Sequence, residues 1–287
     1  MSRGLIIKGV GGFYYIETEG GIIRARGKGT LKNDGILLMV GDEVEYEERE
    51  DDDLITRVLP RKNHFSRPPI ANLDMLVVVM AQSKPKANTL IIDKMLTIAE
   101  AQGVDSIICI NKCDEGDPEE GLRLKEIYSV AYPTFLVSAK NGHNLEELLR
   151  AIEGKRVALA GPSGAGKSTL TNALIPSATM EVGSISEKTS RGKHTTRHVE
   201  MFHLGSGYLF DTPGFTSLDA GDEEERDLGE LFPEIRKNMG KCRFDDCLHL
   251  KEPGCAVRRA VEEGEMSESR YESYVSMLEE VKNRRRF

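Results

Sequence analysis

A phosphate-binding loop constrains this chain more than any other feature. The stretch "GPSGAGKS" runs from Gly161 to Ser168 and fits the pattern of Gly, four residues and Gly-Lys-Ser. It follows the apolar run "RVALA" and precedes "TLTNAL", so a strand enters the loop and a helix leaves it. The glycines let backbone N–H groups converge on phosphate oxygens, and the helix N-terminus adds partial positive charge. The pattern predicts an α/β domain that binds a phosphate chain.

The residue types in the loop also indicate the roles of its two last members. Lys167 is expected to reach the β and γ phosphates, and the Ser168 hydroxyl is expected to hold Mg²⁺. The nucleotide-binding residues predicted for the loop are Gly161, Pro162, Ser163, Gly164, Ala165, Gly166, Lys167, Ser168 and Thr169.

A second motif, "DTPG", follows the apolar run "GYLF". Downstream of a phosphate loop, its Asp211 is expected to bind Mg²⁺ through water, and the Gly214 N–H is expected to face the γ-phosphate. The polar segment "SEKTSRGKHTTRH" lies between the two motifs. Thr195 is its predicted ligand for Mg²⁺ and the γ-phosphate, with Thr196 as the alternative. The predicted catalytic residues are Lys167, Ser168, Thr195, Asp211 and Gly214.

The motif "NKCD" predicts that the base is guanine. The Asp114 carboxylate can accept from guanine N1–H and N2–H₂, a donor pair that adenine lacks. Asn111 is expected to bond the Hoogsteen edge and tie the loop together, while the Lys112 stem packs along the base. In "SAK", at the end of another strand, the Ala139 N–H is expected to meet guanine O6. The predicted base-binding residues are Asn111, Lys112, Asp114, Ser138, Ala139 and Lys140.

The order of these motifs is reversed, because the base motifs precede the phosphate loop. In a parallel α/β sheet the nucleotide loops all emerge at the carboxyl ends of the strands, so their position in space matters and their order along the chain does not. Joining neighbouring termini and opening the chain elsewhere preserves such a site. The sequence therefore predicts a circularly permuted P-loop GTPase domain that binds GTP or GDP with Mg²⁺.

Three of the five cysteines lie in "CRFDDCLHLKEPGC". Cys242, Cys247, His249 and Cys255 offer three thiolates and an imidazole, a donor set that suits one tetrahedral structural Zn²⁺. The spacing departs from paired Cys-x-x-Cys, so buried cysteines beside a surface histidine are the alternative. Cys109 and Cys113 are assigned to core packing or to an incidental place in a loop.

The 287 residues divide into three regimes. Residues 1–68 contain short strand-like runs punctuated by glycines, which predicts a small β-barrel. A proline-marked linker is expected at Ser66 to Asn72, and residues 69–219 then alternate apolar strands with amphipathic helices. Residues 220–287 contain an acidic segment, the cysteine cluster and a helical end. The predicted fold class is multidomain α/β.

The net charge of -8 argues against a nucleic-acid partner, but basic residues gather around Arg24 and Arg26, around Arg57 and Arg61, and in the tail "KNRRRF". Basic surfaces are therefore compatible with an acidic chain, although solvated faces explain any single cluster. The opening residues lack the features of a signal peptide, and no apolar run is long enough to cross a bilayer. We expect a cytoplasmic monomer without a membrane partner.

The motif order "NKCD", "SAK", "GPSGAGKST", "HTT", "DTPG", with the barrel before it and the spacing Cys-x4-Cys-x-His-x5-Cys after it, resembles the RsgA (YjeQ) family of small ribosomal subunit biogenesis GTPases over nearly the whole chain. The resemblance implies that the barrel is an OB-fold and that the cysteine region is a zinc-binding domain. It also implies that the partner is the 30S subunit with its 16S rRNA, whose late maturation the protein assists while hydrolysing GTP.

The sequence also bears on catalysis. Many GTPases carry a glutamine after Asp-x-x-Gly to orient water, but here Phe215 follows Gly214. Slow intrinsic hydrolysis is therefore expected, with ribosome binding completing the geometry and His194 or His198 as water-positioning groups.

The sequence leaves two other functional classes open. One is an RNA-binding assembly factor that uses GTP and GDP only as a conformational switch, with Phe13, Tyr14 and Tyr15 near Arg24 and Arg26 as its stacking and basic groups. These aromatics fit a barrel core equally well. The other class, an ATPase or small-molecule kinase, is disfavoured by Asp114.

Overall fold

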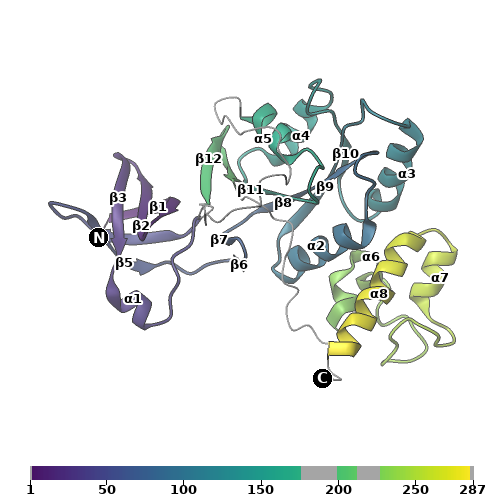
Figure 1. The fold of residues 1–287 in the computed structure, drawn as a ribbon. Coiled ribbons are helices and arrows are strands. Elements are labelled where there is room, and N and C mark those ends of the chain that lie inside the picture. Colours follow the sequence, from purple (N-terminus) through teal and green to yellow (C-terminus); the bar gives the residue numbers. More distant parts are fainter. Residues whose placement is uncertain (1, 176–198, 212–226, 285–287) are drawn as a thin grey trace, which may run out of the picture.

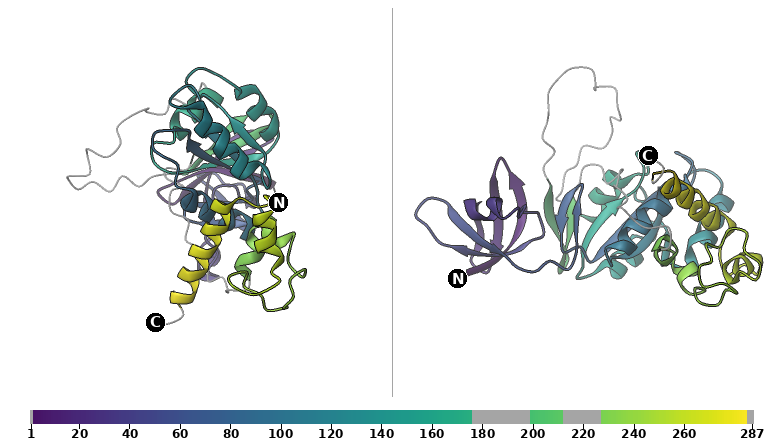
Figure 2. Two further views of the ribbon diagram at one scale, coloured as in Figure 1. Left: turned by 90° about the vertical axis from the view of Figure 1, so that its right-hand side faces the viewer. Right: turned by 90° about the horizontal axis from the view of Figure 1, so that it is seen from below.

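The computed structural model describes residues 2–175, 199–211 and 227–284, and for residue 284 its backbone only. The described chain forms an elongated molecule with a small barrel at one end, a helix-covered sheet in the middle, and a helical part at the other end (Figures 1 and 2). The predicted multidomain architecture is confirmed in this arrangement.

The N-terminal part is a closed five-stranded barrel of the OB type, as predicted. Its strands follow the order β1-β2-β3-β5-β4, and β4 pairs back onto β1 to close it. Small and branched apolar side chains alternate inward along the strands, so Ile6, Ile16, Val44 and Ile55 are fully buried. The elements are β1 Ser2–Val10, β2 Phe13–Thr18, β3 Gly21–Gly27, α1 Gly29–Asn33, β4 Glu43–Glu47 and β5 Asp53–Val58.

The segment predicted to be a linker is instead a packed hairpin. Strand β6, His64–Ser66, pairs with β7, Pro69–Ala71. Ile70 and Ala71 are fully buried, and the Ala71 N–H donates to the Val40 carbonyl at 2.9 Å. The prolines indicated a break in regular structure, but the burial of these two apolar side chains fixes the hairpin between the barrel and the central sheet.

The central sheet contains the strands that the apolar runs predicted. Strands β10, β9, β8, β11 and β13 are neighbours in this order and run parallel, and β12 lies antiparallel beside β13. Every residue of β8 is buried, as expected for a parallel strand covered on both faces. The bounds are β8 Met75–Ala81, β9 Asp105–Asn111, β10 Thr134–Leu136, β11 Arg156–Ala160, β12 Glu200–Leu204 and β13 Gly207–Asp211.

Helices cover both faces of this sheet (Figure 1). Apolar residues of α2 and α3 join one core, and those of α4 and α5 join the other. Helix α3 was not predicted, because most of its residues are polar; it begins where the Asp117 carboxylate accepts from the Glu119 N–H and Pro118 occupies the first turn. The bounds are α2 Thr89–Ala101, α3 Pro118–Ser129, α4 Leu145–Ile152 and α5 Lys167–Leu174.

The barrel and the central sheet share one hydrogen-bonded sheet of eleven strands. The junction is the antiparallel contact of β1 with β12, where Lys8 lies opposite Glu200. The sequence predicted two separate β regions, since nothing in the local pattern of either strand shows that they pair.

The C-terminal part packs on α2 through an arginine that is fully buried. Arg270 of α8 donates to Asp93 of α2 at 2.7 Å and to both carboxylate oxygens of Glu234 at 2.9 Å, and its guanidinium lies 4.9 Å from the centre of the Phe232 ring. Two carboxylates and one cation therefore join helices from different parts of the chain. The elements are the 3₁₀ helix η1 Asp227–Leu231, α6 Pro233–Arg236, α7 Ala256–Glu262 and α8 Glu268–Arg284.

Replacing Arg270 by alanine is expected to destabilise the protein by about 3 to 5 kcal/mol, because Asp93 and Glu234 would remain as buried carboxylates without a cation. Urea unfolding followed by circular dichroism measures the change. Arg236→Ala is the matched control: this arginine pairs with Glu100 at 2.9 Å, but its side chain is 52% exposed, so a loss below about 1 kcal/mol is expected. Equal losses in the two variants would contradict the account.

Within the three described segments, no helix has the length and apolar character needed to span a membrane.

Candidate functional site

The predicted nucleotide motifs meet at one edge of the central sheet. Strands β9, β10, β11 and β13 run parallel, so their carboxyl ends lie on the same side. Asn111 is the last residue of β9, Ala160 is the last of β11, and Asp211 is the last of β13. The fold therefore brings together motifs that are as far apart in sequence as Asn111 and Asp211.

The phosphate loop follows β11 and turns sharply into α5. Gly161, Gly164 and Gly166 have φ angles of 145°, 81° and 93°, which only glycine adopts readily. A Cβ atom on Gly161 would lie 2.0 Å from the Val79 carbonyl oxygen of the neighbouring strand. The backbone is thus free to approach β8, and α5 begins at Lys167 with its N-terminus at the loop.

The Lys167 side chain lies over this loop. Its Nζ donates to the carbonyl oxygens of Gly161 at 2.7 Å and Pro162 at 3.0 Å, and burial lowers the pKa of the amine. Ser168 and Thr169 follow in the first turn of α5. A cationic group beside a glycine-rich loop at a helix N-terminus is the arrangement that receives phosphate oxygens.

Asn111 connects three of the predicted motifs. Its Nδ2 donates to the Ala165 carbonyl of the phosphate loop at 3.1 Å, and its Oδ1 accepts from the Ala139 N–H of "SAK" at 3.0 Å. Asn111 is buried, and a Cβ on Gly166 would lie 2.3 Å from its Nδ2. The predicted tie between loops is present, whereas a bond from this amide to a base is a prediction that the structure does not test.

Asp114 follows the end of β9 at the same edge of the sheet and is exposed. The Ser138 hydroxyl donates to its carboxylate and lowers its pKa, and the charges of Lys140 and Lys112 act in the same direction. The carboxylate is therefore ionised at neutral pH and can only accept hydrogen bonds. Lys112 has a φ of 62°, and its Nζ donates to the Lys84 carbonyl at 2.7 Å, which fixes its stem beside Asp114.

Asp211 lies at the end of β13, beside the phosphate loop. Burial raises its pKa, and so does the charge of Glu200, the residue directly opposite on β12. Gly214, Thr195 and the alternative Thr196 lie outside the described residues, as do His194, His198 and Phe215. Of "DTPG" the structure thus describes only Asp211, and the roles of the other residues stay predictions.

The four metal-ligand candidates form one cluster in the C-terminal part. The ligand atoms of Cys242, Cys247, His249 and Cys255 all lie within 4.8 Å of one another. His249 Nδ1 lies 3.6 Å from Cys242 Sγ and 3.5 Å from Cys255 Sγ. A tetrahedron with Zn–S of about 2.3 Å and Zn–N of about 2.0 Å has separations of about 3.5 Å between sulfur and nitrogen and about 3.8 Å between two sulfurs. The cluster therefore fits zinc.

Surrounding groups hold this cluster in place. Cys255 is the N-cap of α7, and its sulfur accepts from the Arg258 N–H at 3.5 Å. The Tyr271 hydroxyl donates to the His249 carbonyl at 2.7 Å, and Tyr274 donates to the Leu248 carbonyl at 2.9 Å. Burial lowers the pKa of His249, which keeps its imidazole neutral and able to bind a metal.

Sequence reasoning missed two residues that contact the nucleotide motifs. Glu200 is the first residue of β12, and the register of the β12–β13 hairpin places it opposite Asp211. Counting outward from the turn at Gly205 would have found it. Lys84 contributes only a backbone carbonyl to Lys112, and no sequence signal marks such a contact.

Comparisons with known proteins agree with this geometry. The family model described as RsgA GTPase matches residues 58–221, and the model described as RsgA N-terminal domain matches residues 3–54. A protein of Bacillus subtilis (strain 168) named small ribosomal subunit biogenesis GTPase RsgA is 40% identical over 295 residues, covering 99% of both chains. A protein of the same name from Alkaliphilus metalliredigens (strain QYMF) is 40% identical over 292 residues and covers 100% of both.

Two solved structures are similar over nearly the whole chain. The crystal structure of YloQ, described as a circularly permuted GTPase, has a TM-score of 0.82 at 37% identity and covers 99% of this chain and 96% of its own. The crystal structure of YjeQ from Thermotoga maritima has a TM-score of 0.85 at 37% identity and covers 98% of each chain.

Proposed function

The chain belongs to the RsgA family of circularly permuted GTPases, and from this membership we propose that it binds the small ribosomal subunit and hydrolyses GTP to GDP and phosphate while assisting late subunit maturation. The observation that carries the nucleotide part is the position of Asn111, which joins the phosphate loop to the "SAK" loop by hydrogen bonds of 3.1 and 3.0 Å. The ribosomal part follows from what the relatives are named for.

Guanine is held by the two base motifs. The ionised Asp114 carboxylate accepts from guanine N1–H and N2–H₂, and the Ala139 N–H donates to O6. Lys112 packs its stem along one side of the base, and Lys140 adds positive charge near Asp114. Ser138 orients Asp114 through its hydroxyl.

The phosphates are held by the loop from Gly161 to Thr169. Lys167 turns from the loop carbonyls toward the β and γ phosphates, and the backbone N–H groups bind the remaining oxygens. Mg²⁺, when bound, neutralises charge on the phosphate oxygens. Ser168 and Thr195 would supply oxygen ligands for it, Asp211 would bind it through water, and the Gly214 N–H would face the γ-phosphate.

Hydrolysis is completed by the ribosome. Phe215 stands where many GTPases carry the glutamine that orients water, so the isolated protein turns over slowly. His194 or His198 positions the water once the subunit is bound. Zn²⁺ held by the Cys242, Cys247, His249 and Cys255 cluster stabilises the C-terminal part and takes no part in the reaction, because four protein ligands leave no position for water.

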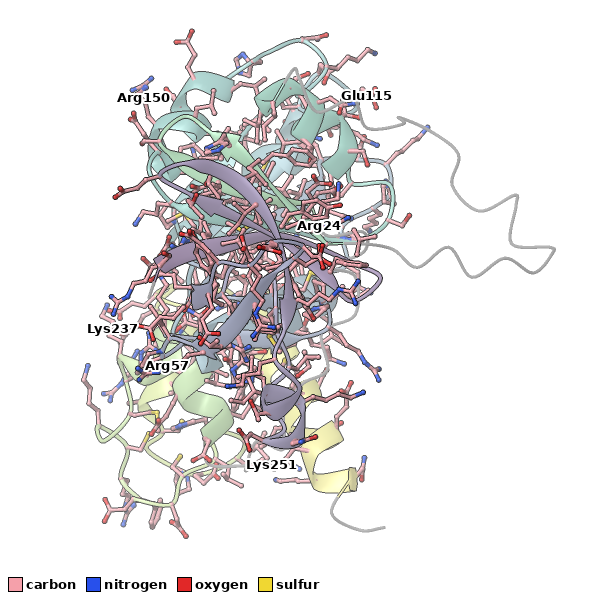
Figure 3. The ribbon with its side chains drawn as sticks, turned by 90° about the vertical axis from the view of Figure 1, so that its left-hand side faces the viewer. Arg24, Arg57, Glu115, Arg150, Lys237 and Lys251 are labelled. Atoms are coloured by element: carbon pink, nitrogen blue, oxygen red, sulfur yellow. The ribbon has the colours of Figure 1, made fainter. Side chains whose placement is uncertain are left out.

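The barrel supplies a surface for the 16S rRNA. Arg26 lies 4.3 Å and Arg24 lies 5.0 Å from the centre of the Phe13 ring, and Asp52 pairs with both arginines. Arg24 and Arg57 are both carried by the barrel end of the molecule (Figure 3). Arginine stacked on an aromatic ring is a group that receives nucleotide bases.

The protein acts as a cytoplasmic monomer.

The first test compares GTP hydrolysis by the purified protein alone, with 30S subunits and with 50S subunits, and repeats each with ATP. Stimulation of GTP hydrolysis by 30S alone is the expected result, since the subunit completes the catalytic geometry. Tight GTP binding without stimulated turnover would favour the conformational-switch function. Hydrolysis of ATP as fast as GTP would overturn the assignment of Asp114.

A further inference from the structure

Three charged side chains form a row across the junction of the barrel and the central sheet. Lys8 of β1 lies opposite Glu200 of β12, and Glu200 lies opposite Asp211 of β13. Directly opposed residues of antiparallel strands point to the same face of a sheet, with Cβ atoms about 5 Å apart. Lys8, Glu200 and Asp211, here called the charge row, therefore extend from the barrel to the nucleotide edge.

The first step in the charge row is a short ion pair. Lys8 Nζ lies 2.7 Å from Glu200 Oε2, and the two side chains are 35% and 31% exposed. Partial burial strengthens the attraction relative to a fully exposed pair. The Lys8 ammonium thus offsets the charge of Glu200.

The second step is a repulsion. Glu200 and Asp211 are like charges in directly opposed positions, an arrangement that disfavours two ionised groups. The negative charge of Glu200 therefore acts on the end of β13, and Glu200 on β12 lies between Lys8 on β1 and Asp211 on β13.

We propose that Lys8 is a positioning residue of the nucleotide site, which acts through Glu200 and Asp211 to favour GTP over GDP. This inference rests on the proposed role of Asp211 at Mg²⁺ and the γ-phosphate. GTP places one more phosphate group than GDP at the end of the charge row. Without Lys8, the uncompensated charge of Glu200 would repel that group, whereas GDP has no phosphate there. The barrel, remote in sequence from the phosphate loop, thereby sets nucleotide preference.

Removing Lys8 should not displace the barrel, because other contacts hold the same junction. His203 Nε2 lies 2.7 Å from Glu17 Oε1 of the barrel, and the Tyr208 hydroxyl donates to the same carboxylate. Arg156 of β11 donates to Glu43 of the barrel at 2.7 Å. The effect of a Lys8 variant can therefore be read as an electrostatic one.

The test measures the dissociation constants of GTP and GDP, each with Mg²⁺, by fluorescence of a labelled nucleotide. Lys8→Met is expected to raise the ratio of the GTP constant to the GDP constant about three- to tenfold. In a Glu200→Gln background the same Lys8→Met change is expected to leave the ratio unaltered within about twofold, because the charge that Lys8 offsets is gone. Lys8→Arg keeps the wild-type ratio.

Lys94→Met is the matched control. Lys94 also forms a 2.7 Å pair with a glutamate and is also 35% exposed, but it joins α2 to α8 and not the barrel to the sheet. Its ratio should equal that of the wild type. The proposal would be overturned if the GTP-to-GDP ratio of dissociation constants in Lys8→Met were no larger than in Lys94→Met. It would also be overturned if Lys8→Met raised this ratio equally in the Glu200→Gln background.

A fifth variant separates this inference from the proposed function. Asp211→Asn should weaken Mg²⁺-dependent GTP binding whether or not Lys8 acts on the site. If Asp211→Asn has this effect and Lys8→Met has none, the proposed role of Lys8 is wrong and the proposed function stands. If Asp211→Asn leaves GTP binding unchanged, the role of Asp211 itself is wrong.

Discussion

Replacing Asp114 by asparagine is expected to change the base that the protein selects. The ionised carboxylate accepts two hydrogen bonds from guanine, and an asparagine amide would present its NH₂ to one of those donors. A site built around such bonds discriminates by about 10⁴-fold against a base that leaves them unmade. The affinity of the variant for GTP should fall by this factor. The variant should instead prefer xanthosine triphosphate (XTP), whose C2 carbonyl accepts a hydrogen bond from the new NH₂. Competition binding of GTP, XTP and ATP measures the change.

Asp117→Asn is the control for this prediction. Asp117 lies three residues further along and caps α3 by accepting from the Glu119 N–H at 3.0 Å, and asparagine caps equally well. The same chemical change there should leave base preference as it is. Retention of GTP preference by Asp114→Asn would show that "NKCD" does not read the base.

Loss of zinc is expected to unfold the C-terminal part. Structural zinc contributes apparent binding free energy of about 10 kcal/mol or more, and this energy is available only to the folded ligand set. Cys255→Ser should remove most of it without removing the N-cap acceptor of α7, because the serine hydroxyl can replace the thiol in that role. The destabilisation can then be assigned to the metal. The chain has no tryptophan, so its near-ultraviolet circular dichroism comes mainly from its eight tyrosines. Tyr271 and Tyr274, which bond the cluster backbone, contribute to this signal, and a decrease in it reports the unfolding.

Cys113→Ser provides the comparison for metal content. Cys113 is a partly buried free thiol outside the cluster, so this variant should hold about one zinc per chain, as the wild type does. Zinc is measured by atomic absorption before and after a chelator. Full stability of Cys255→Ser, or a wild-type chain with no zinc, would contradict a structural metal site.

The local motifs were predictable because their chemistry is short-range. The glycines of the phosphate loop are required by backbone angles such as the φ of 145° at Gly161, and this requirement shows in the sequence as a pattern of eight residues. The zinc cluster is similar, since its four ligands span fourteen residues. Helix α3 was not predicted because most of its residues are polar and only a few are buried, among them Leu124, Ile127 and Tyr128.

Contacts between distant segments were not predictable. The Arg270 cluster joins α8 to Asp93 of α2 and Glu234 of α6, and the pairing of Lys8 with Glu200 joins residues 192 positions apart. Charged residues are normally solvated, so the sequence favoured exposure for each of them. Their burial and pairing depend on which surfaces meet.

The sequence by itself determined the nucleotide motifs, their permuted order and the ligand set of the metal site, because glycine geometry and donor chemistry act within a few residues. The tertiary structure alone decided that Asn111 joins the phosphate loop to "SAK" and that the barrel extends the central sheet through β1 and β12. Such pairings arise when the burial of apolar surface brings remote segments together, and hydrogen bonds then select among the arrangements that burial permits.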